Sequence, residues 1–407
     1  MRSDAWRCST FGASWLRRSV IGAVCLVVVL GLTGPAVAGG PSPTWVRATA
    51  FRAESVAAAP AGGAVVVGVR GAGREDQIAV IRTYRPDGTA RWTTTWVPSV
   101  GWAAASAVAV SADGIFVAGA MGPDRAPPPC NEIGSFSRFV LALNHRGRVL
   151  WLRGDTTWKN CHSDAATAVG AGRGLVVVAT TRSIEGSIDY HGRMVAFTAG
   201  GRRLWANGFE VPGLPWASAD SVSDLETDVA GRSFAAGNAW SRAVLDPPAD
   251  SEAVLQALTR DGDRRWSKVF GEPGKWLDDR DRGTAVDVRG GRVMFGAMID
   301  LQDPKGVRSR LMSFTTAGER QWVQGFKAVA AHSARTVVAL GRSGRAYASS
   351  SVRDDVYGGM RAVLRAFSEE GRVLWERALG GSRRVVDLDA GQGLFVLQRN
   401  RVLRFPG

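Results

Sequence analysis

The 407-residue sequence has few of the residues and motifs on which common catalytic and metal sites depend. It contains four cysteines and four histidines, and the histidines are scattered singly along the chain. It lacks the Gly-x-Ser-x-Gly, phosphate-loop and His-Glu-x-x-His motifs of serine hydrolases, nucleotide-binding proteins and zinc peptidases. We therefore expect no cofactor and no metal, and the composition identifies no reaction.

The sequence also lacks an apolar run long enough to span a membrane, which takes about 20 residues. The run from Val20 to Leu32 is followed at once by glycine and proline. Arg17 and Arg18 precede it, and Ala36-Val37-Ala38 fits a signal-peptidase site. Residues 1–38 are therefore predicted to be a signal peptide and residues 39–407 a secreted, extracellular protein. A signal that is retained would instead hold the protein in the cell envelope.

Removal of the signal leaves Cys130 and Cys161 as the remaining cysteines. Because secreted proteins mature under oxidising conditions, this pair is predicted to form one disulfide. Closing the intervening loop would contribute about 3–4 kcal/mol in the chain-entropy description. Two free thiols on separate loops remain the alternative.

Negative charge is in short supply, since 51 lysines and arginines face 37 aspartates and glutamates and give a net charge of +14. Removing the net +3 of residues 1–38 leaves +11 on the mature chain. Such a field favours anionic partners without specifying one. We expect an extracellular glycan, another polyanion or a protein as partner, no specific nucleic acid, no membrane span after cleavage, and a monomer.

What the sequence does contain is an internal repeat of a large apolar residue, a glycine four residues later and a tryptophan four residues after that. Successive tryptophans of the repeat are 59, 54, 61, 56 and 53 residues apart. This period is typical of a four-stranded propeller blade with long loops. The six instances are Tyr84-Gly88-Trp92, Leu143-Gly147-Trp151, Phe197-Gly201-Trp205, Leu258-Gly262-Trp266, Phe314-Gly318-Trp322 and Phe367-Gly371-Trp375.

Each instance is predicted to be a hairpin, because alternating apolar strands flank a polar turn in which glycine supplies a positive φ. Seven further strand pairs are found, one before each hairpin and one before the C-terminus, so one blade lacks its last strand. The chain ends in a strand at 402–405, and Thr44–Arg47 carries a seventh tryptophan. We predict an all-β, seven-bladed propeller over residues 39–407, closed by the N-terminal strand.

The segments Ala109–Gly119 and Arg138–Trp151 resemble the repeats of bacterial seven-bladed β-propellers, a group often placed with the quinoprotein-dehydrogenase-like propellers. The resemblance covers essentially residues 44–407. It implies the propeller fold and a secreted or surface location, and it implies no particular activity. Quinoprotein enzymes carry a vicinal disulfide, and this chain has no adjacent cysteines, so the resemblance does not extend to their cofactor.

The hairpin tryptophans are predicted to pack between neighbouring blades. Five other tryptophans are predicted to lie in the connections between blades or between the second and third strand of a blade. These connections share one side of a propeller, here called the loop face. Exposed indoles there would suit sugar rings, whereas packing of each indole under its own loop is the alternative. The five are Trp102, Trp158, Trp216, Trp240 and Trp276.

Three aspartates, Asp164, Asp220 and Asp281, occupy matching places ahead of the first strands of blades three to five. They favour either loop capping or, near the central channel, acid–base chemistry on a carbohydrate. We therefore predict a secreted, non-catalytic binding or interaction module that recognises a glycan or other ligand on its loop face. A carbohydrate-active hydrolase or lyase is the alternative, and a structural surface protein also fits.

Overall fold

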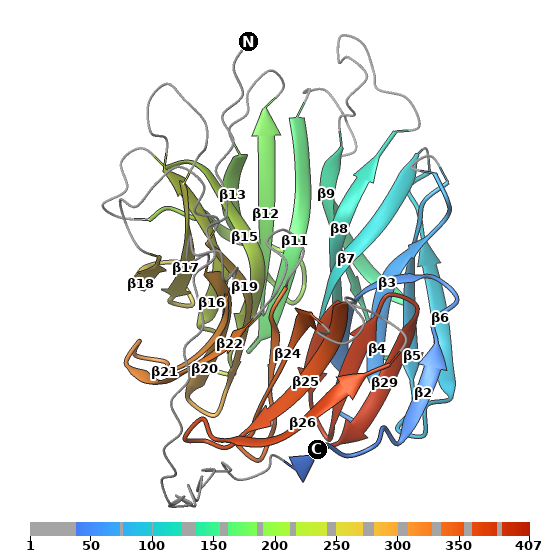
Figure 1. The fold of residues 1–407 in the computed structure, drawn as a ribbon. Helices are drawn as coiled ribbons and strands as arrows, with labels where there is room; N and C mark the ends of the chain where they lie inside the picture. Colours follow the sequence, from blue (N-terminus) through green and yellow to red (C-terminus); the bar gives the residue numbers. More distant parts are fainter. Residues whose placement is uncertain are drawn as a thin grey trace, which may run out of the picture. The chain divides into compact units, whose positions relative to one another are not determined.

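The computed structural model describes residues 38–407 except for 74–75, 100, 124–135, 155–161, 185–189, 212–216, 242–249, 272–280, 300–307, 328–334, 354–359 and 381–384. The regular secondary structure in the described residues is entirely β-strand (Figure 1). The described residues include no helix of the length and apolarity that a membrane crossing requires. Residues 1–37 of the predicted signal peptide and the two cysteines Cys130 and Cys161 lie outside the described residues.

The strands form seven sheets, each an antiparallel meander of four strands, as the repeat predicted. Blade 1 contains β3 (Arg52–Ala58), β4 (Ala64–Arg70), β5 (Ile78–Tyr84) and β6 (Ala90–Trp96). Blade 2 contains β7 (Trp102–Ser111), β8 (Gly114–Gly122), β9 (Ser137–Leu143) and β10 (Val149–Gly154). Blade 3 contains β11 (His162–Gly172), β12 (Leu175–Ile184), β13 (Tyr190–Thr198) and β14 (Arg203–Gly208).

The remaining blades follow the same order along the chain. Blade 4 contains β15 (Ala217–Thr227), β16 (Ser233–Ser241), β17 (Asp250–Leu258) and β18 (Arg264–Phe270). Blade 5 contains β19 (Arg282–Arg289), β20 (Arg292–Ile299), β21 (Arg308–Thr315) and β22 (Arg320–Lys327). Blade 6 contains β23 (Val337–Leu340), β24 (Ala346–Arg353), β25 (Met360–Phe367) and β26 (Val373–Leu379). Blade 7 contains β27 (Asp387–Ala390), β28 (Gly393–Gln398), β29 (Arg401–Pro406) and β2 (Trp45–Ala48).

The first strand of each blade contacts the first strand of the next, from β3 to β7 and onward to β27, which contacts β3 again. The seven sheets therefore form a closed ring around these strands (Figure 1). Valine, alanine, leucine and phenylalanine side chains of the middle strands are buried between successive sheets. The core is thus divided among the interfaces between blades.

Contacts between neighbouring blades explain the spacing of glycine and tryptophan in the repeat. The hairpin tryptophan of one blade packs against the hairpin glycine of the next, as Trp92 does against Gly147. Its indole N–H also donates a hydrogen bond to the carbonyl two residues before that glycine, at 3.1 Å for Trp92 and His145. Five other pairs repeat this bond: Trp45 to Pro86, Trp151 to Ala199, Trp205 to Arg260, Trp266 to Thr316 and Trp322 to Glu369.

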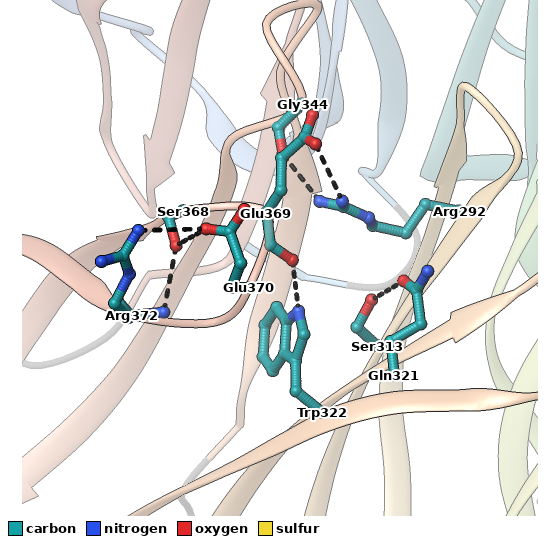
Figure 2. Close-up of polar contacts among 9 residues, drawn as sticks. All are labelled: Arg292, Ser313, Gln321, Trp322, Gly344, Ser368, Glu369, Glu370 and Arg372. Carbon is teal, nitrogen blue, oxygen red and sulfur yellow. Dashed lines mark hydrogen bonds and ion pairs between the residues drawn. The ribbon is translucent and has the colours of Figure 1, made fainter.

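Figure 2 shows this junction between blades 5 and 6. The indole of Trp322 donates to the Glu369 carbonyl at 2.7 Å, in the turn between β25 and β26. The guanidinium of Arg292, on β20, donates to the Gly344 carbonyl at 2.8 Å and lies 3.7 Å from the Glu369 carboxylate. Turns of blade 6 are therefore held by side chains of blade 5.

The N-terminal segment closes the ring, which confirms the prediction for Thr44–Arg47. Strand β2 pairs antiparallel with β29, with Trp45 opposite Arg404. One further strand, β1 (Ala38–Gly39), pairs parallel with β26 on the outer edge of blade 6. A Cβ on Gly40 would lie 2.5 Å from the Trp375 ring. Gly40 therefore takes the place of the hairpin glycine that blade 7 lacks.

Replacing Gly371 with alanine is expected to destabilise the protein by about 2–5 kcal/mol, since a positive φ costs about 1–2 kcal/mol and overpacking adds about 1–3 kcal/mol. Gly371 has φ of 84°, and its added Cβ would lie 2.5 Å from Trp322. Gly174 is the matched control, because it has φ of 72° and nothing within 4 Å of an added Cβ. Urea denaturation measures the loss in free energy of unfolding of both variants. Equal losses in Gly371→Ala and Gly174→Ala would contradict the packing role of the tryptophan.

Candidate functional site: an acidic channel and an arginine cluster

The first strands of the blades enclose a central cavity of about 330 Å³. Alternate residues of these strands face it, because side chains of a β-strand point to opposite sides in turn. Three strands, β15, β19 and β27, place acidic residues there. Five carboxylates of these strands line the cavity, namely Asp224, Glu226, Asp287, Asp387 and Asp389. Asp228, in the turn after β15, lines it as a sixth and forms an ion pair with Arg232.

Four of these carboxylates join neighbouring blades through backbone N–H groups. Asp224 accepts a hydrogen bond from the N–H of Val286 at 2.9 Å, and Asp287 accepts one from Leu340 at 2.5 Å. Asp387 and Asp389 on β27 accept hydrogen bonds from strand β3 of blade 1, at 2.9 Å from Val56 and 2.6 Å from Ala58. The aspartates therefore connect the innermost strands of successive blades.

The channel holds these acids at unusually high pKa values. Burial and, after it, the nearby charge of Asp389 raise the pKa of Asp287 to about 7. Burial and the charge of Asp224 raise the pKa of Asp387 to about 7. Burial and three carboxylate neighbours raise the pKa of Glu226 well above its ordinary value. Part of the channel charge is therefore neutralised by protons near neutral pH.

Within the described residues, no group of three or more histidine, cysteine, aspartate or glutamate side chains is arranged to hold a metal ion. Acids with a pKa near neutrality can exchange protons with a bound molecule. The channel carboxylates combine that property with the hydrogen bonds that join blades.

The three aspartates singled out from the sequence lie elsewhere. Asp164 lies in β11 and forms an ion pair with Arg138. Asp220 lies in β15, and Asp281 immediately precedes β19; both are buried and both have interaction partners. None of the three lines the central cavity that the structure describes. Their positions therefore lend no support to the alternative of acid–base chemistry at this cavity, and the role of the three aspartates stays a prediction.

Asp281 does approach another carboxylate, that of Glu252 on β17. A Cβ added to Gly271 would lie 1.6 Å from the Glu252 carboxylate and 2.7 Å from that of Asp281. The Asp281 N–H also donates to the Ser251 carbonyl at 2.9 Å. These two acids are buried at the loop-face end of blades 4 and 5 and have partners in the chain.

The predicted tryptophan surface is described only in part. Trp102 is the first residue of β7, is 5% exposed and packs beside Phe136 with ring centroids 6.2 Å apart, so it offers a ligand little surface. Trp240 lies within strand β16 and not in a connection, because it pairs with Ala219 and Ser251. Trp158, Trp216 and Trp276 lie outside the described residues.

Basic residues gather at the loop-face end of blades 2 and 3. Arg182 on β12 stands opposite Asp164 on β11, and Arg193 on β13 stands opposite Thr180, two residues from Arg182. Directly opposite residues of antiparallel strands share a sheet face, so these side chains lie on one face of blade 3. Arg138, at the start of β9, reaches Asp164 from blade 2. We call Arg138, Arg182 and Arg193 the arginine cluster.

The arginine cluster carries an excess of positive charge. Burial lowers the pKa of Arg193, and the charges of Arg138, Arg203 and Arg182 lower it too, whereas Asp164 raises it. Among the residues that the structure describes, the ion pair of Asp164 is with Arg138, and none is formed by Arg182 or Arg193. A half-buried guanidinium surrounded by like charge is the setting in which an anion lowers the electrostatic energy.

The acidic channel has a local sequence signal. Acidic residues alternate with apolar ones in Asp224-Leu225-Glu226 and Asp387-Leu388-Asp389, and Asp287 lies between two valines. Asp387 and Asp389 lie in β27, the first strand of blade 7. The arginine cluster gave no comparable signal, because its members come from three strands of two blades.

No protein-family model matches the chain, and no curated protein matches its sequence. Solved structures do match it. Raptor from Chaetomium thermophilum is 11% identical with a TM-score of 0.51 over 90% of this chain, which spans only 30% of the length of Raptor. Extracellular domains of Drosophila semaphorin 1b are 8% identical, with a TM-score of 0.49 over 90% of this chain and 87% of that one.

An ulvan lyase, of a polysaccharide lyase family, is 10% identical with a TM-score of 0.47 over 80% of each chain. At such identities the likeness concerns the fold alone. The resemblance to bacterial propeller repeats is accordingly supported for the seven-bladed architecture and not for membership of the quinoprotein-like group.

Proposed function

We propose that this protein is a secreted, non-catalytic interaction module that binds an acidic polysaccharide at the arginine cluster. The observation that carries the proposal is the half-buried Arg193, which lies among other arginines without an ion pair to any residue that the structure describes. The propeller fold is consistent with an interaction module. Secretion follows from the predicted signal peptide, and it would place the module where such polymers occur.

The chemistry of the cluster matches carboxylate or sulfate groups. A guanidinium offers a planar fork of N–H donors that binds two oxygens of such a group at once. Asp164 engages Arg138, which leaves Arg182 and Arg193 for the ligand. The net charge of +11 on residues 39–407 speeds the encounter with a polyanion, and the cluster supplies the specific contact.

The loop tryptophans remain part of the proposal. Trp158 precedes β11 in the sequence by four residues. Indole faces there, and those of Trp216 and Trp276, would stack on the sugar rings while the arginines bind their acidic groups. The five-tryptophan surface first predicted is reduced by the buried Trp102 and by Trp240, which belongs to a strand.

The test is binding of purified residues 39–407 to carboxylated, sulfated and neutral polysaccharides at two salt concentrations. The Arg182→Ala/Arg193→Ala variant is expected to weaken binding to acidic polymers by about 100-fold or more, since it removes two charged hydrogen bonds of about 1.5–3 kcal/mol each. Arg310→Ala is the matched control, because the two arginines occupy equivalent positions in their blades. Arg310 on β21 pairs with Gly325 on β22, and Arg193 on β13 pairs with Gly208 on β14. Equal binding by both variants would reject the cluster as the site.

A carbohydrate-active enzyme is the second candidate, favoured by the two channel acids with pKa values of about 7. Such acids suit proton transfer to or from a sugar. The same panel, assayed for newly formed chain ends, decides between the two functions. Turnover that is lost in Asp387→Asn would replace the proposed binding function with an enzymatic one.

A further inference from the structure

A second cavity, of about 570 Å³, lies on the side of the hairpin turns between blades 1 and 2. Its volume falls within the range of pockets that bind small molecules. Pro60, Val65 and Ile115 form apolar parts of its wall. It is separate from the central cavity, which in blades 1 and 2 is lined by residues of the first strands, β3 and β7.

The register of the sheets explains why space is left there. Val65 lies opposite Thr83, which lies opposite the hairpin tryptophan Trp92. In four other blades the position of Val65 holds a larger side chain, and the position of Thr83 holds alanine or serine. The larger residues are Phe116, Phe234, Met294 and Tyr347. A phenylalanine at position 65 would therefore occupy part of the volume that is open in blade 1.

The polar groups of this cavity are placed for a ligand with one anionic end. Arg85 and Arg91 line it and are exposed, His145 lines it as well, and no carboxylate is among the described residues that do so. Thr83, 6% exposed, has a hydroxyl with no hydrogen-bond partner among the described residues. A buried hydroxyl without a partner is costly, and a polar group on a ligand would relieve that cost.

We propose that this cavity binds a small amphiphile with an apolar aromatic or aliphatic body and a single carboxylate or sulfonate group. The body lies against Val65 and Ile115, and the anionic group faces Arg85 and Arg91. This inference is independent of the polysaccharide function, because it concerns different residues and a different side of the ring.

The probe is 8-anilinonaphthalene-1-sulfonate, whose fluorescence rises in apolar sites, with the uncharged N-phenyl-1-naphthylamine beside it. We expect saturable binding of the anionic probe with one site per chain. Val65→Phe should weaken the binding of both probes at least 10-fold. Thr83→Ala should alter it by only a few-fold. Both variants introduce residues that other blades carry at these positions, so folding should be preserved.

The contribution of charge is tested with Arg91→Glu. This substitution should weaken binding of the anionic probe about 10-fold and leave binding of the uncharged probe unchanged. Arg265→Glu is the matched control, since Arg265 precedes Trp266 as Arg91 precedes Trp92 and is equally exposed. A folded Val65→Phe variant that binds both probes like the wild type would overturn the proposal. If Val65→Phe does not fold, the proposal would be overturned by an equal loss of binding to the anionic probe in Arg91→Glu and Arg265→Glu.

Discussion

Replacing Trp45 with alanine is expected to lower the free energy of unfolding by about 3–5 kcal/mol, the usual loss for a large buried aromatic residue. Trp45 is 8% exposed and packs against Tyr84 and Phe395, with ring centroids 6.1 and 6.0 Å away. Its indole also donates to the Pro86 carbonyl at 2.9 Å. Because Trp45 belongs to the strand that completes blade 7, the substitution weakens the closure of the ring as well as one interface.

Urea denaturation measures this loss, and Val46→Thr on the same strand is the control. Val46 is 41% exposed, so its replacement is expected to change the free energy of unfolding by less than about 0.5 kcal/mol. Weakened pairing of β2 also exposes the edge of β29, which favours association between chains. The Trp45→Ala protein should therefore show concentration-dependent aggregation on heating. Equal stability of the two variants would contradict the closure of the ring by β2.

The second large effect is a loss of stability as the pH rises from about 4 to about 7. Asp287 and Asp387 have pKa values of about 7 in the folded protein, against an ordinary value of 3.8. The folded state therefore binds protons more tightly than the unfolded chain in this range. Their contribution is fully present below about pH 4 and is lost as the pH passes through about 7. Each acid contributes a slope of up to about 1.4 kcal/mol per pH unit.

Denaturation at pH 5, 6, 7 and 8 measures this slope, and Asp387→Asn should reduce it by roughly half. Asparagine keeps an oxygen that accepts the hydrogen bond from the Val56 N–H, and it removes the charge. The free energy of unfolding of the variant should therefore rise relative to that of the wild type as the pH rises. Asp87→Asn is the control, because hydrogen bonds from Thr89 lower the pKa of this exposed acid. Any pH-dependent contribution of Asp87 to stability therefore changes below pH 4, outside the measured range. Stability that rises from pH 5 to pH 7, unaltered by Asp387→Asn, would be evidence against buried acids in the channel.

The acidic channel and the arginine cluster were not predicted from the sequence. The acids of β15, β19 and β27 belong to blades 4, 5 and 7, and nothing local to any one strand says that they face the same cavity. The prediction placed Asp164, Asp220 and Asp281 together because they occupy similar positions in their repeats. In the structure, Asp164 is instead held by Arg138 from the preceding blade.

The sequence by itself determined the number of blades, the four strands of each and the closing role of the N-terminal strand. These follow from local information: alternation of apolar residues defines strands, a turn glycine defines each hairpin, and a missing tryptophan identifies the incomplete blade. The contacts between blades were decided only by the tertiary structure. Trp322 meets Gly371, and Asp387 meets Val56, only after the ring brings distant strands together. The acidic channel, the arginine cluster and the cavity beside Val65 arise between blades, which no pattern within a single repeat describes.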